Sequence, residues 1–318
     1  MENVIRLSPN DKIDMQFKEP PDPKTWDKEI WLENNPVDYI QSVKIINCFP
    51  NGCSRFAFEP IYKISRLYLP DILYKFYALD DDQDLNTTKI ETLRRQEVYL
   101  SELSQYNDPY DGRALFYYPH ELERFAALKE HKGRLIDDFA SFHIGTSLSA
   151  NNYMNMPMWA HYSNNHRGYC VSYKKSNNNM LREFAFPTQY INARIDVTDY
   201  LVSMAEEAVF EIEKQGMLGE KEIVLSEPSF IYVMVLLDNI KGIDWANENE
   251  FRLSLPKMKQ NRYVQLKPDK IYIGMDCDVE YETTLLEIAR NQNIPAYKMH
   301  QGAAEGQYKF GPTLTGDK

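Results

Sequence analysis

Alternating apolar and polar residues predict strands along most of the chain. In LYKFYAL (73–79) the alternation is typical of a strand that buries one face. It places Lys75 and Tyr77 on one face and Tyr74 and Phe76 on the other. Further strands are expected, in chain order, at 98–103, 135–144, 169–173, 189–197, 251–255, 263–266, 271–273 and 296–299.

Apolar residues three and four positions apart predict helices between these strands. A long amphipathic helix is expected to begin at Thr198 and to run to Gln215. At 80–96, Thr88 and Glu91 have the spacing of a capping box, in which each side chain bonds the other's backbone at a helix start. Other helices are expected at 121–133, where Gly133 would end the helix, at 229–239 and at 279–291.

Strands that are spread among helices indicate an α+β fold, in a single mixed domain with a central, mostly antiparallel sheet flanked by helices. The first 65 residues are expected to form an N-terminal arm and a lead-in segment, because EPPDPKTW and similar stretches are polar and proline-rich. Residues 66–305 would form the catalytic-like or ligand-binding domain, and 306–318 a loose tail.

Composition narrows the classes of partner. With 36 Lys and Arg against 47 Asp and Glu, the chain has a net charge of -11, which argues against a nucleic-acid partner. Four cysteines are too few for a disulfide framework, so we expect reduced thiols and a cytoplasmic location. The N-terminus has no apolar signal segment, and no run reaches the roughly 18 apolar residues of a membrane span.

The segment MWAHYSNNHRGYCVSY (158–173) concentrates chemistry-bearing side chains. His161, His166 and Cys170 are donors that zinc accepts, but no fourth ligand lies nearby in the sequence, and no metal is expected. We interpret Trp159, His161 and Tyr162 as a pocket wall that is also part of the core.

A second dense segment is WANENEFRL (245–253). In a strand, Glu248, Glu250 and Arg252 would share one face, while Phe251 and Leu253 would face the core. Spacing alone favours an ordinary Glu–Arg pair on a solvated edge. The alternative is a pair of carboxylates that stabilises positive charge in a transition state. The chain contains no Walker loop, GxGxxG, GxSxG, HExxH or CxxC motif.

Four segments, in this order, resemble the bacterial family called domain of unknown function 2971: LYKFYAL, TKIETLRRQEVYLSELSQYNDPYDG, MWAHYSNNHRGYCVSY and WANENEFRL. The corresponding family patterns are "LYKY-R", "L-F-S-----FNDPFD", "MW-HYA--H-G-C--F" and "W--E-EWRL". The resemblance covers about residues 73 to 300. One departure is that Tyr77 stands where the family pattern has Arg.

The family's layout resembles the ADP-ribosyltransferase superfamily in outline, which implies NAD as a co-substrate. An early strand with Lys75 and Tyr77 would hold NAD, and a strand with Tyr99 and Ser101 would support the nicotinamide pocket. The late strand would carry the catalytic Glu250, assisted by Glu248. The resemblance further implies that aromatic rings sandwich the nicotinamide, and the candidates are Tyr77, Tyr99, Trp159 and Tyr162. The remaining cofactor-binding candidates are His161 and His166.

The function implied is that of an NAD-consuming ADP-ribosyltransferase or NAD glycohydrolase in bacterial or phage conflict. Its expected partners are a nucleotide small molecule and a protein target. One alternative is a non-enzymatic module of an antiphage defence system that binds a ligand or a protein. Another is a metal-dependent hydrolase or nuclease that uses His161, His166 and a carboxylate.

Overall fold

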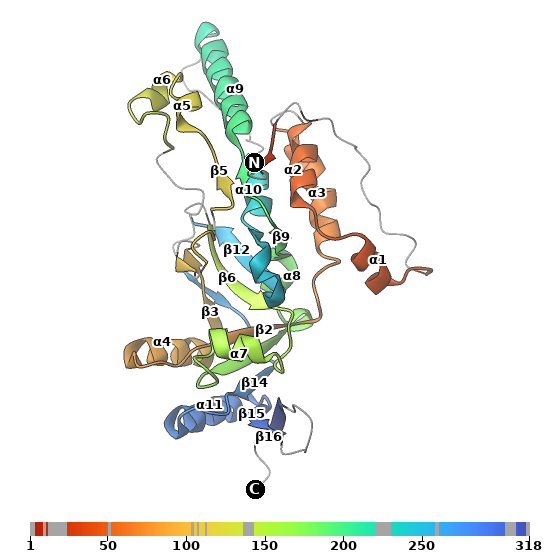
Figure 1. The fold of residues 1–318 in the computed structure, drawn as a ribbon, viewed down its shortest axis with the longest axis vertical. Coiled ribbons are helices and arrows are strands. Elements are labelled where there is room, and N and C mark those ends of the chain that lie inside the picture. Colours follow the sequence, from red (N-terminus) through yellow and green to blue (C-terminus); the bar gives the residue numbers. More distant parts are fainter. Residues whose placement is uncertain are drawn as a thin grey trace. The chain divides into compact units, whose positions relative to one another are not determined.

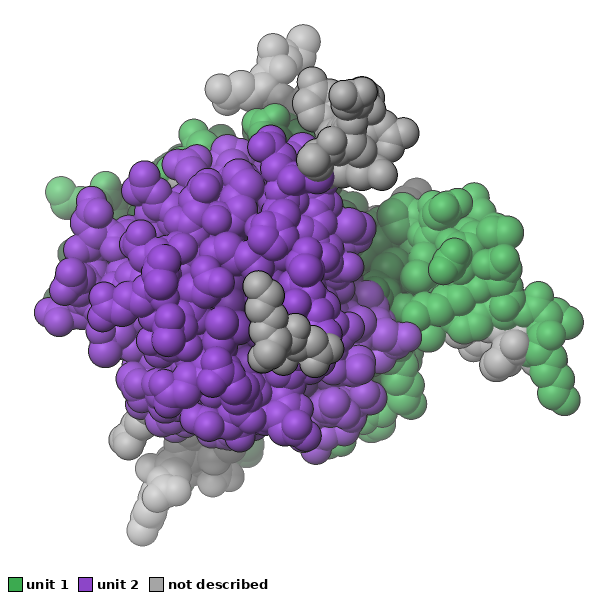
Figure 2. Space-filling view, turned by 90° about the horizontal axis from the view of Figure 1, so that it is seen from below, with its two compact units in different colours: residues 1–68, 102–143, 187–245 green, residues 69–101, 144–186, 246–318 purple. Residues whose placement is uncertain are grey.

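The chain forms two units that are interleaved along the sequence. The computed structural model describes residues 4–8, 11, 24–49, 52–102, 105–106, 108–111, 113–135, 143–219, 230–257, 261–302 and 310–315. Unit 1 comprises Met1–Tyr68, Glu102–His143 and Pro187–Trp245, and unit 2 comprises Leu69–Ser101, Ile144–Phe186 and Ala246–Lys318. Figure 2 colours the two units separately.

Unit 2 is built on a large sheet, and Figure 1 labels its strands β2, β6, β12, β14, β15 and β16. Within the described residues the sheet has nine strands in the order β16-β15-β14-β7-β2-β6-β12-β8, with β4 beside β6. The bounds of the strands are β2 Ile72–Tyr77, β4 Ser101–Glu102, β6 His143–Ser149, β7 Tyr169–Lys174, β8 Ala185–Pro187, β12 Glu250–Pro256, β14 Lys270–Ile273, β15 Ala296–Gln301 and β16 Phe310–Leu314.

The sheet is mostly antiparallel, as predicted. β2 pairs antiparallel with β6 and β7, β7 with β14, and β15 with β16. β14 and β15 are parallel because helix α11 (Val279–Gln292) connects them. The α+β class with a mixed sheet flanked by helices is therefore confirmed.

Helices and apolar side chains cover both faces of the sheet. Leu73 of β2 packs in a core with Ile90 of α4 (Gln83–Arg94) and Leu285 of α11. Tyr74 and Phe76 point the other way and join a second cluster under α7 (Met156–Tyr162). The sequence pattern of β2 therefore assigned its two faces correctly.

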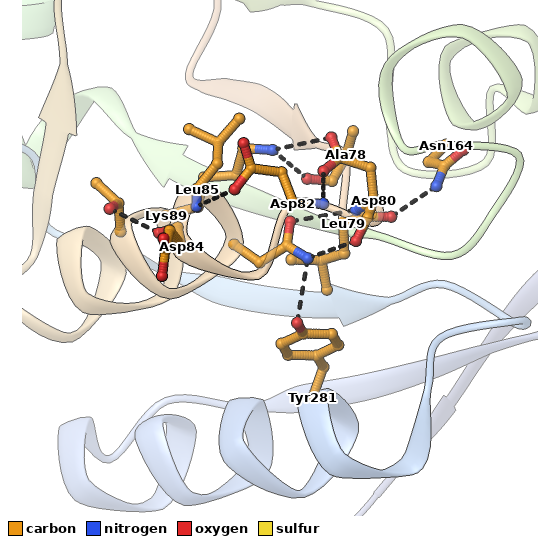
Figure 3. Close-up of polar contacts among 11 residues, drawn as sticks. Ala78, Leu79, Asp80, Asp82, Asp84, Leu85, Lys89, Asn164 and Tyr281 are labelled. Atoms are coloured by element: carbon orange, nitrogen blue, oxygen red, sulfur yellow. Dashed lines mark hydrogen bonds and ion pairs between the residues drawn. The ribbon is translucent and has the colours of Figure 1, made fainter.

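The corner after β2 is held by side chains that bond to its backbone, as Figure 3 shows. Asn86 donates to the carbonyl of Asp80 at 2.7 Å, and Lys89 donates to the carbonyl of Ala78 at 2.8 Å. Asn164, from the 158–173 segment, donates to the carbonyl of Leu79 at 2.7 Å. The acidic run that begins at Asp80 is thus part of a structural turn.

The start of α4 differs from the prediction. Asp82 is the N-cap, and its Oδ1 accepts from the Leu85 backbone N–H at 2.9 Å. Thr88 lies inside the helix, where its Oγ1 donates to the carbonyl of Asp84 at 2.9 Å. An aspartate cap satisfies the same orphan N–H groups as a threonine cap, so the Thr88–Glu91 spacing is coincidental here.

Unit 1 consists of helices and two small parallel sheets. One sheet has the order β1 (Ile5–Arg6), β10 (Ile195–Asp196), β5 (Leu115–Phe116). The other pairs β9 (Gln189–Ile191) with β11 (Ile240–Gly242). Its longer helices are α1 Lys28–Asn34, α2 Tyr39–Asn47, α3 Ser54–Ser65, α9 Thr198–Met217 and α10 Phe230–Leu237. No described helix combines the length and the apolar composition that a membrane span needs.

The predicted lead-in segment contributes helix α2 to the core of unit 1. Val43 and Ile46 of α2 are both 0% exposed. The Tyr39 hydroxyl donates to the carbonyl of Pro187 at 2.6 Å, and Gln189 accepts from the Tyr39 N–H. A short strand or helix was expected at 40–46, and the structure shows a helix there.

Several expected elements are shorter or divided. The helix expected at 121–133 is two turns, α5 (Pro119–Leu122) and α6 (Ala126–Lys129). The strand expected at 98–103 is divided into β3 (Glu97–Tyr99) and β4, and the one expected at 189–197 into β9 and β10. The remaining short elements are η3 Lys175–Asn177, α8 Asn179–Phe184, η4 Ile243–Glu248 and β13 Tyr263–Gln265.

One internal strand and the predicted tail also differ from expectation. Of the strand expected at 135–144, residues 136–142 lie outside the described part, and β6 continues to Ser149. Part of the expected loose tail, Phe310–Leu314, is β16, which pairs with β15 at the edge of the sheet. Polar and glycine residues are tolerated in an edge strand, so composition did not reveal it.

Candidate active site

Glu250 is a buried carboxylate at the start of β12. Its side chain is 2% exposed. Ser147 of the neighbouring strand β6 donates its hydroxyl to Oε1 at 2.5 Å. Arg252 donates from Nε to Oε1 at 2.9 Å and from Nη2 to Oε2 at 3.3 Å. Both oxygens of the Glu250 carboxylate therefore have partners.

The pairing of Glu250 with Arg252 follows from the alternation of side chains along a strand. Residues two apart on β12 share a face, as the sequence predicted. The Arg252 side chain is 0% exposed, so the pair does not lie on a solvated edge. Burial of a charge costs free energy unless the charge is paired and hydrogen-bonded, and this pair meets both conditions.

Lys75 of β2 adds a second cation beside the same carboxylate. Its Nζ donates to the carbonyl of Ser147 at 3.2 Å and lies 5.4 Å from the centroid of the Tyr77 ring. Burial lowers the pKa of Lys75 to about 8, although the charge of Glu250 acts to raise it. Lys75, Ser147 and Glu250 thus come from three consecutive strands, β2, β6 and β12.

Tyr77 is a packed core ring. It stacks on Tyr169 with centroids 4.7 Å apart and planes at 10°. Its hydroxyl lies 3.3 Å from the hydroxyl of Tyr173. Burial raises the pKa of Tyr77 above the ordinary tyrosine value, because the buried site disfavours the charged phenolate.

Glu248 connects the late acidic segment to the 158–173 segment. It is the last residue of η4 and is 6% exposed. The Tyr162 hydroxyl donates to its Oε1, and Ser149 donates to its backbone carbonyl at 2.6 Å. Asn249 has a φ of 46°, and this left-handed residue separates Glu248 from the strand. Of the three residues expected to share one strand face, β12 therefore contains Glu250 and Arg252 but not Glu248.

The other expected ring partners occupy different places. Trp159 is 0% exposed, and its Nε1 donates to the carbonyl of Tyr153 at 2.7 Å. It contacts Phe76 edge-on, on the opposite face of β2 from Tyr77. Tyr77 and Trp159, two of the four candidate rings, therefore lie on opposite faces of the sheet, because β2 alternates between the two faces.

The two histidines of the 158–173 segment have different surroundings. His161 is exposed in the last turn of α7, and its ring contacts Tyr162. His166 has a φ of 68° and stacks on Trp159 with centroids 6.0 Å apart. Burial lowers the pKa of His166, which favours the neutral ring. Cys170 is 0% exposed in the core.

Tyr99 and Ser101 do not share one strand. Tyr99 lies on β3, which pairs with β13 in a separate two-stranded sheet, and its ring is 5.3 Å from that of Tyr263. Ser101 lies on β4, beside β6 in the large sheet. The buried Leu100 lies between them, and its backbone N–H donates to the carbonyl of Arg262 at 2.8 Å.

Sequence reasoning missed Ser147. The strand predicted at 135–144 ended before it, although HIGTSLS continues to alternate through Ser149. Extending the alternation would have placed both serines on one face. In the described part of the chain, no three His, Cys, Asp or Glu side chains form a group that could hold a metal ion. The alternative with His161, His166 and a carboxylate therefore has no assembled ligand set there.

Comparison with known proteins gives one finding. The sequence model of the family described as "Protein of unknown function (DUF2971)" matches residues 158–253. This stretch contains two of the four segments on which the resemblance rests, the one around Trp159 and the one around Glu250. Nothing matched in the comparisons with curated proteins and with solved structures.

Proposed function

We propose that unit 2 carries an NAD-consuming site, of ADP-ribosyltransferase or NAD glycohydrolase type, with Glu250 as its carboxylate. The observation that carries the proposal is the linked cluster of Lys75, Ser147 and Glu250 on three consecutive strands. The resemblance in outline calls for a basic or polar residue on an early strand and a glutamate on a late strand. The cluster contains both.

The chemistry requires few groups. When the bond between the nicotinamide nitrogen and ribose C1′ breaks, its electron pair goes to the nitrogen and C1′ becomes positive. A fixed carboxylate, here Glu250, stabilises that charge. Ser147 and Arg252 hold the carboxylate in place. An oxygen of water or of a protein acceptor then bonds to C1′ and releases its proton to solvent.

In the proposed site, Lys75 supplies the positive charge that is lost because Tyr77 stands where the family pattern has Arg. The family pattern has Arg at that position, whereas Tyr77 is stacked on Tyr169. Lys75 lies two residues earlier on the same strand and beside Glu250. In the proposed site its ammonium interacts with the pyrophosphate of NAD.

The test is nicotinamide release from NAD by the purified full-length protein. We expect Glu250→Gln to lower the rate by about 100-fold or more, because the charge that stabilises C1′ is lost. Glu280→Gln, at an exposed glutamate of α11, is the matched control and keeps the rate. Ser147→Ala, which loses one hydrogen bond to Glu250, should lower the rate by about tenfold.

Melting temperatures of all four proteins show whether each variant is folded. A folded Glu250→Gln protein that releases nicotinamide at the rate of the unmodified protein would remove Glu250 from the role. Because Glu250 is paired with Arg252, loss of its charge can destabilise the fold, and Ser147→Ala then supplies the decisive comparison.

The second candidate is a binding module of a defence system without catalysis. It is favoured by the fact that Glu250 already has protein partners at both oxygens. In that case the unmodified protein releases no nicotinamide, and neither NAD nor ADP-ribose raises its melting temperature.

A further inference from the structure

A cavity of about 330 Å³ lies within unit 1, at the carboxyl ends of strands β9 and β11. The two strands are parallel, so the residues that follow them, 192–194 and 243–245, line the same space. Binding crevices in sheets with parallel strands commonly form at this edge. The volume is at the lower end of the range for small-molecule sites. We refer to it as the β9–β11 cavity.

Lys241 contributes a buried cation to the cavity wall. Its side chain is 6% exposed, and its Nζ lies 3.9 Å from Oδ2 of Asp111. The same Nζ is 4.9 Å from the centroid of the Trp245 ring. An ammonium has three donors, so it can bind the carboxylate of a ligand in addition to these neighbours.

Arg194 places a second cation at the cavity. Its Nε donates to the carbonyl of Arg113 at 3.0 Å, and its Nη2 donates to the carbonyl of Leu115 at 3.1 Å. The guanidinium lies 5.0 Å from the centroid of Phe116. These contacts fix an exposed guanidinium, which presents planar donors that match a carboxylate.

Carboxylates line the same space. Asp108 is 6% exposed, and its Oδ1 accepts from the Tyr110 backbone N–H at 2.8 Å. Asp244 is exposed, in the first turn of η4. A wall with both signs of charge attracts neither a simple anion nor a simple cation strongly, because each meets one repulsive group for every attractive one.

Apolar surface completes the cavity. Tyr110 and Ile243 line it and are 60% and 50% exposed, respectively. The backbone bond to Asp108 fixes the turn that carries Tyr110. Large apolar side chains that stay exposed beside a charged hollow offer contact area to the apolar part of a ligand.

We propose that the β9–β11 cavity binds a small zwitterion of the amino-acid class with a flat or apolar side chain. Its carboxylate faces Lys241 and Arg194, its ammonium faces Asp108 and Asp244, and its side chain packs against Tyr110 and Ile243. This site is independent of the NAD-consuming site, because all of its residues belong to unit 1.

Isothermal titration calorimetry on the full-length protein tests the proposal with L-phenylalanine, L-tyrosine and L-leucine. Two probes keep the phenyl group but lack one charge each: 3-phenylpropanoate has no ammonium, and phenethylamine has no carboxylate. We expect at least one amino acid to bind, and both single-charge probes to bind about tenfold more weakly than L-phenylalanine. If none of the amino acids binds at millimolar concentration, or if a single-charge probe binds as well, the proposal is overturned.

Two exposed positions allow variants that leave the core unchanged. Arg194→Gln removes the rim cation and Asp244→Asn removes the rim anion, and each should weaken amino-acid binding by about tenfold. Lys129→Gln, at an exposed lysine of α6, is the control and leaves binding unchanged. Binding that is unaffected in both rim variants would place the ligand elsewhere.

Discussion

At the scale of single residues, Lys75 makes stability depend on pH. Burial lowers its pKa in the folded chain to about 8, from 10.5. Between these values the unfolded chain binds more protons, so stability rises with pH in this window. Between pH 7 and about pH 9.5, we expect the free energy of unfolding to rise by about 2 kcal/mol, because the buried Lys75 loses its charge.

Urea unfolding at several pH values measures this effect as a difference between proteins. Lys75→Met keeps the aliphatic stem and should lose the rise, whereas Lys267→Met, at an exposed lysine of unit 2, should retain it. Buried tyrosines such as Tyr77 have raised pKa values and act above this range. Equal slopes for Lys75→Met and the unmodified protein would show that Lys75 is not the titrating group.

Residue-level reasoning recovered part of the candidate site. Alternation alone placed Glu250 and Arg252 on one face, and their pairing followed. It could not show that the pair is buried, because burial depends on which strands cover β12. Ser147 and Lys75 reach Glu250 only through the sheet order β2-β6-β12, which local patterns do not specify.

At the scale of elements, Gly168 sets how closely two segments approach. A Cβ at this position would lie 1.8 Å from the backbone oxygen of Tyr77, so the strands must separate to admit it. We expect Gly168→Ala to lower the free energy of unfolding by about 3 kcal/mol or more. Gly311→Ala has no atom within 4 Å of the added Cβ and should be nearly neutral. Equal melting temperatures for the two variants would contradict this expectation.

Loss of the N-cap of α4 should lower stability by a smaller amount, which melting temperatures can also measure. Asp82→Ala leaves the Leu85 N–H without its acceptor and should cost about 1 kcal/mol. Asp81→Ala, next to it and exposed, is the control and should change stability little. If instead Thr88→Ala were the costly substitution, the capping-box interpretation would be restored.

Elements with strong periodicity were predicted well, and those with broken periodicity were not. β2, β7 and α11 lie within one or two residues of their expected bounds. The strand expected at 189–197 divides because β9 pairs with β11 whereas β10 pairs with β5. Which partner a short strand takes depends on distant sequence, so no local signal marks the break.

At the scale of the whole molecule, substitutions in the N-terminal helices α1 and α2 can show which of them stabilises unit 1. Ile46 of α2 is 0% exposed, whereas Ile30 of α1 is 57% exposed. We expect Ile46→Ala to lower the free energy of unfolding by about 3 kcal/mol, because it leaves a cavity. Ile30→Ala should cost less than about 0.5 kcal/mol. Similar small costs at both positions would mean that α2 is dispensable.

The division into two units was not predicted. The reason is that segments which contact each other in the fold are far apart in the sequence. Tyr39 bonds to Pro187, 148 residues away. Hydrophobic periodicity covers windows of 11 to about 18 residues, so it reports elements and not their partners. The sequence therefore predicted the elements of one mixed fold but not which of them pack together.

The interleaved order of segments has a consequence for synthesis on the ribosome. The last segment of unit 1 ends at Trp245, and by then unit 2 still lacks its strands from β12 onward. A nascent chain emerges N-terminal part first. The core around Leu69–Ser101 can begin to form with β7, but it stays incomplete until β12 and α11, which carry Leu253 and Leu285, have also emerged.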